Sequence, residues 1–97
     1  MTYEISESVV WTGAGNEVRL YDTDSGEFRT LNDSAAQIWH LITDGACEQQ
    51  VSDVLVEKYS AGDADEGAVI ARDVHRFLAT LVEGAILVRT DTAGDDC

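Results

Sequence analysis

The stretch Tyr21–Gly45, YDTDSGEFRTLNDSAAQIWHLITDG, contains the change from strand to helix that decides the fold. Residues 22–26 are turn formers, and Gly26 suits the left-handed backbone that closes a hairpin. Residues 28–31 then have the residue types of a strand. From Asn32, the predicted N-cap, apolar residues recur with helical spacing until Gly45 ends the helix. The apolar face of this helix comprises Ala35, Ile38, Trp39 and Ile42.

Two further strand-like runs precede this stretch. Val9–Trp11 and Val18–Tyr21 are short and rich in β-branched and aromatic residues, and residues 12–16 between them contain two glycines. Because both connections are short, the three runs are expected to pair as neighbouring antiparallel strands.

Two further helices are expected after it. Apolar spacing predicts the first over 48–59, and its inward positions are Val51, Val54, Leu55 and Tyr59. The other is predicted to begin near Glu66 and to end at Gly84, and its inward positions are Ile70, Val74, Leu78 and Leu81. The apolar run Ile86–Val88 is expected to return to the sheet or to pack below it.

Three antiparallel strands followed by three helices predict a small α+β domain that resembles a winged helix. A chain of 97 residues suits a single core, so residues 1–90 are expected to form one domain. The acidic residues 91–97 are expected to be a disordered tail.

The chain is strongly acidic, with 19 Asp and Glu against six Lys and Arg and a formal net charge of −13. Such a field repels phosphate backbones and anionic lipid headgroups, so neither nucleic acid nor a membrane is an expected partner, and a monomer is expected. No secretory signal is recognisable, which predicts a cytoplasmic protein. Cys47 and Cys97 match neither a zinc site nor a disulfide framework, and free thiols are expected.

No residue pattern predicts catalysis, a metal or a cofactor. His40 and His75 lack a second ligand at metal-binding spacing, and the Gly13-x-Gly15 pair lacks the third glycine of a nucleotide cradle. No serine lies in a nucleophile elbow. The chain is therefore expected to be a binding protein rather than an enzyme.

The predicted third helix has a second stripe beside its core face. The stripe comprises Val69, Asp73, Arg76, Phe77 and Thr80, and the helix also contains Arg72. Either this stripe lines a binding groove, or Phe77 belongs to the core and both arginines are solvated. Helical periodicity leaves both interpretations open.

The stretch quoted above resembles the PqqD-like family in its hairpin, its Leu31-Asn32 junction, its Ile-Trp pair and its Asp-Gly end. The similarity continues through Phe77-Leu78 and Gly84, so that it covers about positions 9–88. This resemblance implies an element that binds the leader of a ribosomally synthesised, post-translationally modified peptide precursor. The spacing from Leu31 to Ala35 is most similar to the free-standing recognition proteins of lasso-peptide biosynthesis, which implies a leader peptidase and a macrocyclase as partners.

The expected binding mode is the addition of the leader as a strand to the third strand of the sheet. An edge strand leaves unpaired N–H and C=O groups, and an extended peptide satisfies them. Specificity would come from leader side chains in pockets between the third strand and the third helix. The predicted peptide-binding residues are Glu27, Phe28, Arg29, Thr30, Leu31, Val69, Arg72, Asp73, Arg76 and Phe77.

Two alternative functions stay open. A winged helix also suits a DNA-binding protein, although the third helix offers only Arg72 and Arg76 against dense surrounding acid. Other PqqD-like proteins are peptide chaperones for a radical enzyme in quinone-cofactor biosynthesis, and the same resemblance suits that role.

Overall fold

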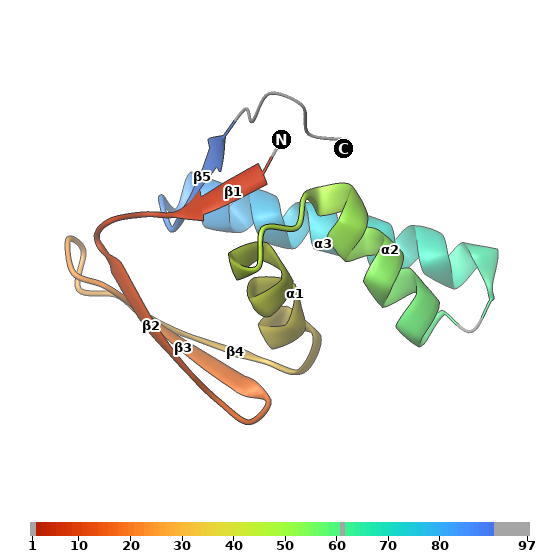
Figure 1. The fold of residues 1–97 in the computed structure, drawn as a ribbon, viewed down its shortest axis with the longest axis horizontal. Coiled ribbons are helices and arrows are strands. Elements are labelled where there is room, and N and C mark those ends of the chain that lie inside the picture. The colour runs from red at the N-terminus through yellow and green to blue at the C-terminus, as the bar shows by residue number, and fades with distance from the viewer. Residues whose placement is uncertain (1, 61, 91–97) are drawn as a thin grey trace.

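The computed structural model describes residues 2–60 and 62–90, so the predicted tail at 91–97 lies outside the described residues. A three-stranded sheet and three helices surround one core (Figure 1). The elements are β1 (Thr2–Ile5), β2 (Val9–Ala14), β3 (Glu17–Asp22), β4 (Phe28–Asn32), α1 (Asp33–Thr43), α2 (Glu48–Tyr59), α3 (Ala64–Glu83) and β5 (Leu87–Thr90). The predicted α+β architecture is confirmed.

The main sheet has the order β2-β3-β4, with antiparallel pairing throughout. The first reversal is tighter than the predicted 12–16, because β2 extends to Ala14 and only Gly15 and Asn16 form the turn. The second reversal contains Gly26 at φ 74°, which confirms its predicted left-handed conformation.

The Asp22 carboxylate organises this second turn. It accepts hydrogen bonds from the amides of Asp24 (2.9 Å) and Ser25 (3.4 Å). The bond from Asp24 is the main reason that the pKa of Asp22 lies below its usual value, since a hydrogen bond to a carboxylate favours the charged form. The turn that leads into β4 is therefore held by local hydrogen bonds.

A second sheet joins the two ends of the described chain. β1 and β5 pair antiparallel from Thr2↔Thr90 to Ile5↔Leu87 and lie side by side, apart from the main sheet (Figure 1). The prediction missed β1. Of the two alternatives for Ile86–Val88, the return to the main sheet is wrong, because Leu87 and Val88 pair with β1, and Ile86 and Leu87 pack in the core. A four-residue strand is stable only with its partner, which here lies more than 80 residues away in sequence.

The helix α1 begins where predicted. Asn32 has the extended backbone of an N-cap, but its side chain makes no capping hydrogen bond, and Asp33 has a φ of 50°. The helix buries Ala36, Ile38, Trp39 and Ile42. Trp39 is fully buried, and Trp11 of β2 contacts it edge-on at 5.8 Å between ring centroids. This contact joins α1 to the inner face of the sheet.

The helices α2 and α3 pack along one another. α2 has its predicted bounds, but Val54 and Tyr59 are 43% and 45% exposed, so their predicted core positions are wrong. The neighbouring elements cover a narrower face of α2 than its apolar residues span. The buried positions of α2 are Val51, Ser52 and Leu55. A Cβ at Gly67 of α3 would lie only 3.2 Å from Val56 Cγ1, which explains a glycine at this close approach.

The helix α3 begins at Ala64, two residues before the predicted start. The Asp63 carboxylate accepts hydrogen bonds from the amides of Asp65 (2.9 Å) and Glu66 (3.3 Å) and so caps the helix. The buried positions along α3 are Gly67, Val74, Leu78 and Leu81, whereas Ile70 is only half-buried.

Cys47 is buried at the N-terminus of α2, where its amide donates a hydrogen bond to Gln50 Oε1 (3.0 Å). Cys47 is disulfide-bonded, so the free thiol predicted at this position is wrong. Cys97 lies outside the described residues.

Candidate peptide-binding site

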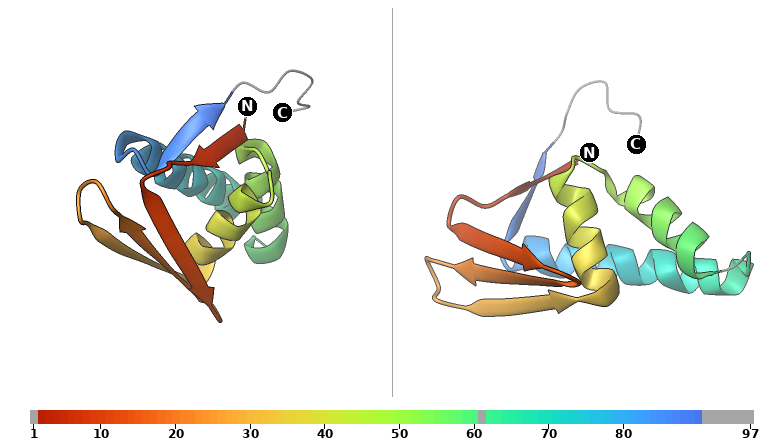
Figure 2. Two further views of the ribbon diagram at one scale, coloured as in Figure 1. Left: turned by 60° about the vertical axis from the view of Figure 1, so that its left-hand side comes forward. Right: turned by 60° about the horizontal axis from the view of Figure 1, so that its bottom comes forward.

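The strand β4 forms one edge of the main sheet. It pairs with β3 on one side, and within residues 2–60 and 62–90 no strand pairs with its other side. Figure 2 shows β4 at this margin of the sheet in its right-hand view, next to the start of α1. An edge of this kind presents backbone N–H and C=O groups that a further strand can use.

Hydrogen bonds at both ends of the β3–β4 ladder show which backbone groups of β4 are already used. The Asp22 amide donates to the Glu27 carbonyl (2.9 Å), and the Asp33 amide donates to the Asn16 carbonyl (3.2 Å). Opposed residues in an antiparallel ladder alternate between hydrogen-bonded and non-hydrogen-bonded pairs. Given the register of the two strands, both bonds assign the odd-numbered residues of β4 to β3. The backbone groups that point to the open edge are those of Phe28, Thr30 and Asn32.

The side chains of β4 alternate between the two faces of the sheet with the same odd–even pattern as its backbone groups. Leu31 is buried in the core and Arg29 is half-buried, so these two residues point inward. Phe28 and Thr30 are exposed on the outer face of the sheet, and Phe28 is 77% exposed. Of the predicted site residues on β4, Leu31 therefore serves the core, and the Phe28 ring lies on the outer face rather than in a groove against α3. Glu27 is exposed in the turn before the strand.

Arg29 reaches from β4 to the C-terminal end of α3. Its Nη2 lies 3.4 Å from the position that a Cβ would take at Gly84, the C-cap of α3. A cation near the last carbonyls of a helix is favoured by the helix dipole. The Arg29 Nε atom is buried and has no hydrogen-bond partner among the described residues.

The predicted α3 stripe is mostly accessible. Val69 is 50% exposed, Arg72, Asp73 and Arg76 are exposed, and Phe77 is half-buried against the core. The solvated arginines and the packing of Phe77 against the core agree with the second interpretation, and the binding groove stays a prediction.

An apolar pocket of about 360 Å³ lies between the three helices. α1 contributes its first residues and Ile38, directly after the end of β4. The full lining is Asp33, Ser34, Ala35, Ile38, Leu55, Tyr59, Ile70, Asp73, Val74 and Phe77. Its size suits one or two large apolar side chains with a polar rim.

This pocket differs from the predicted one in its walls. Asp73 and Phe77 line it as predicted, but no residue of β4 does, and the opposite walls come from α1 and α2. Ile38 and Tyr59, which helical spacing predicts as core positions of their helices, also line this pocket. Tyr59 is held at the rim by a hydrogen bond that Gln37 Nε2 donates to its hydroxyl (2.7 Å). Helical spacing alone cannot distinguish a wall of a pocket from a packed core face.

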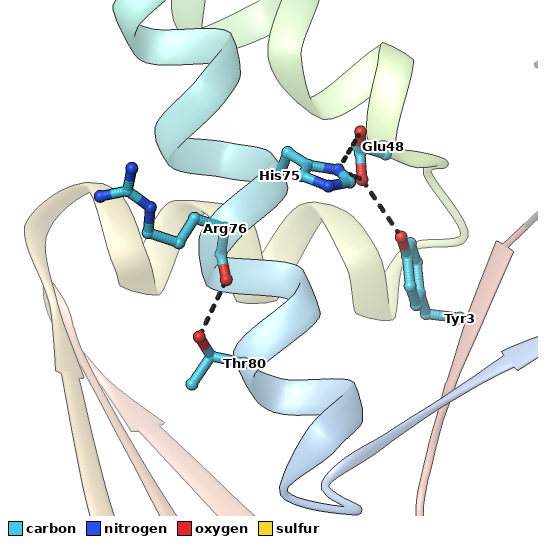
Figure 3. A network of polar contacts seen from close by, with 5 residues as sticks. All are labelled: Tyr3, Glu48, His75, Arg76 and Thr80. Atoms are coloured by element: carbon cyan, nitrogen blue, oxygen red, sulfur yellow. Dashed lines mark hydrogen bonds and ion pairs between the residues drawn. The ribbon is translucent and has the colours of Figure 1, made fainter.

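A polar network lies on another side of α3 (Figure 3). Glu48 of α2 accepts a hydrogen bond from the Tyr3 hydroxyl (3.5 Å) and lies 3.1 Å from His75 Nδ1. Burial, followed by the negative charge of Glu48, raises the pKa of Tyr3 above its usual value. Figure 3 shows Arg76 directed away from this network, so Arg76 and the network lie on different sides of α3.

Among the described residues, no group of three His, Cys, Asp or Glu side chains could hold a metal ion. None of the described helices is long and apolar enough to cross a membrane.

The fold is similar to that of two solved proteins in complex with leader peptides. A solved structure of TbiB1 in complex with the TbiA(beta) leader peptide is similar, with a TM-score of 0.78 and 25% identity over 95% of this chain and 100% of that chain. A second structure, lasso peptide synthetase B1 complexed with the leader peptide, has the same fold, with a TM-score of 0.78 and 24% identity over 92% of this chain and 100% of that chain. No curated protein matches this chain. The family model described as coenzyme PQQ synthesis protein D (PqqD) matches residues 17–87, and the chain therefore belongs to the PqqD family.

Proposed function

We propose that this protein binds the leader peptide of a ribosomally synthesised, post-translationally modified peptide precursor, of the lasso class, by adding it as a strand to β4. The observation that carries this proposal is the open edge of β4, where the backbone groups of Phe28, Thr30 and Asn32 face away from β3. TbiB1, a relative of the same fold, has a leader peptide bound.

Backbone pairing and the pocket supply different parts of the binding energy. Each hydrogen bond along the edge contributes about 0.5–1.5 kcal/mol net, which favours any extended peptide. Selection of one leader needs side-chain contacts, and the pocket between the helices lies directly beyond the end of β4. An apolar leader side chain that enters it displaces water from Ile38, Ile70 and Phe77. A dissociation constant between nanomolar and micromolar, or about 8–12 kcal/mol, fits a complex of this size.

Two exposed arginines of α3 would set charge preferences for the leader. Arg72 and Arg76 are exposed on α3 in a molecule of net charge −13, so they are rare positive points for an acidic leader residue. The same overall charge disfavours DNA as a ligand.

The proposed role is to present the leader without chemistry of its own. A leader peptidase and a macrocyclase of the same cytoplasmic pathway would act on the bound precursor, and the recognition protein would work as a monomer. The N-terminal and C-terminal regions of the leader would remain available to those enzymes, because an added strand is held only along one edge.

Fluorescence anisotropy with a labelled synthetic peptide, carrying the leader of the precursor encoded beside this protein, tests the proposal directly. Saturable binding in or below the micromolar range is expected, and a peptide of the same composition in scrambled order should bind at least about tenfold more weakly. Equal binding of both peptides would refute sequence-dependent leader recognition. A duplex DNA probe at low salt serves as a further comparison, and its tighter binding would favour the winged-helix DNA reading.

The family match supports a second candidate. The PqqD description belongs to a protein of coenzyme PQQ synthesis, so a peptide chaperone for a radical enzyme is compatible with the same edge and pocket. Pull-down from the producing cells with this protein as bait separates the two, since a radical enzyme or a leader peptidase would be retained.

A further inference from the structure

An exposed apolar row crosses the outer face of the main sheet. Val10, Tyr21 and Phe28 lie directly opposite one another on the three neighbouring strands. Val10 is 54% exposed and Phe28 is 77% exposed, although both are large apolar side chains. The Tyr21 and Phe28 rings are in contact, with centroids 4.5 Å apart and planes tilted by 39°, and among the described residues no strand lies on the other side of Phe28.

The open side of Phe28 coincides with the open edge of the sheet. The backbone groups of Phe28 point away from β3, toward the place of an added strand. A residue paired with Phe28 there would have its side chain on the same outer face, with the two Cβ atoms about 4.5–5.5 Å apart. The residues before and after it would point to the inner side, toward α3.

We infer that the leader carries a large apolar or aromatic residue opposite Phe28, and that this residue continues the row of Val10, Tyr21 and Phe28 as its fourth member. The inference rests on the proposed strand addition and names a specificity position that lies outside the pocket. The leader would then be recognised on both faces of the sheet. The pocket would bind leader side chains that point toward the helices, and Phe28 would contact one that points outward.

The next outward position supplies an internal contrast. Two residues along β4, Thr30 lies opposite Arg19 of β3, which forms an ion pair with Glu17 (3.2 Å). This second row is polar, so a leader residue paired with Thr30 gains nothing from apolar character. The outer face therefore favours an apolar leader residue opposite Phe28 but not opposite Thr30.

A coupling experiment tests the inference. Each residue of the synthetic leader is replaced in turn by alanine, and every peptide is titrated against the wild type and against Phe28→Thr, which retains strand propensity at an exposed position. Phe28→Thr should weaken binding of the unmodified leader about tenfold, and alanine at one leader position should then cost no further affinity.

Two matched variants control for general effects. Val10→Ala removes apolar surface from the same row but two strands from the edge, and Arg19→Ala changes an outward side chain of the neighbouring polar row on β3. Both should bind the leader within about twofold of the wild type and show no such coupling, because neither contacts the added residue as Phe28 does.

The outcomes separate the two proposals. If the wild type does not bind the leader, the proposed function fails and this inference falls with it. If the wild type binds and Phe28→Thr binds equally well, or loses the same affinity for every alanine peptide, strand addition can stand but Phe28 does not read a leader residue. Circular dichroism verifies that Phe28→Thr is folded, and Phe28→Val replaces it if it is not.

Discussion

Phe77 lies in two environments at once. Its ring packs against the buried core and also lines the pocket between the helices. A residue placed in this way contributes both to the stability of the free protein and to any ligand that fills the pocket. Its two contributions can be measured separately.

We expect Phe77→Ala to weaken leader binding by about 2–4 kcal/mol, because the pocket loses one of its two aromatic side chains. The free energy of unfolding should also fall, by about 1–3 kcal/mol, since the ring is only half-buried. Anisotropy titration measures the first effect and urea denaturation the second. Val69→Ala, an exposed position outside the pocket on the same helix, should change both by less than about 1 kcal/mol. A less stable variant with unchanged affinity would assign Phe77 to the core alone.

At the scale of elements, the backbone groups of β4 alternate between pairing with β3 and facing the open edge of the sheet. The odd-numbered residues complete the sheet, and the even-numbered ones face the open edge. Proline removes a single N–H, so its effect should depend on the parity of the position.

Thr30→Pro should leave the domain folded but weaken leader binding by about 1–3 kcal/mol, because one edge N–H is lost and the strand is stiffened. Arg29→Pro should instead destabilise the domain, since its N–H belongs to the ladder with β3. Circular dichroism and anisotropy in both variants make the comparison, and Thr30→Ala controls for the loss of the side chain. Strand addition at β4 would be wrong if Thr30→Pro bound the leader normally.

At the scale of the whole molecule, Tyr3 and Glu48 connect β1 to α2 across 45 residues of sequence. Burial and the Glu48 charge raise the pKa of Tyr3 from its usual value of 10.0. A raised pKa in the folded state means that ionisation is easier in the unfolded chain. This contribution to stability is complete below about pH 10 and is lost as the pH rises through the folded pKa of Tyr3.

Urea denaturation between about pH 8 and about pH 11 should therefore show a falling midpoint at the alkaline end. Tyr3→Phe should be less stable than the wild type at the lower pH, because its hydroxyl bond to Glu48 is gone, but its midpoint should fall less steeply. Identical slopes for the two proteins would show that other groups cause the alkaline loss. Glu48→Gln removes the second cause of the shift and should give an intermediate slope.

The sequence by itself determined the elements whose information is local. The turn at Gly26, the change to helical spacing after Asn32 and the bounds of α2 follow from backbone preferences and periodicity within a few residues. The family resemblance rested on residue patterns over about positions 9–88, and the match of the family model over residues 17–87 confirmed it. The site residues that the sequence indicated on β4 and α3 stay a prediction that leader binding must test.

Only the tertiary structure decided what depends on partners distant in sequence. The pairing of β1 with β5 needs strands from the two ends of the chain, and the pocket needs walls from three helices. The exposure of Val54 and Tyr59 depends on how much of α2 its neighbours cover, which its own apolar spacing does not report. Two hydrogen bonds to Asp22 and Asn16 show which residues of β4 pair with β3 and which face the open edge. Backbone groups of a strand alternate with a period of two, but the sequence does not report which residues face which side until a partner strand is in place.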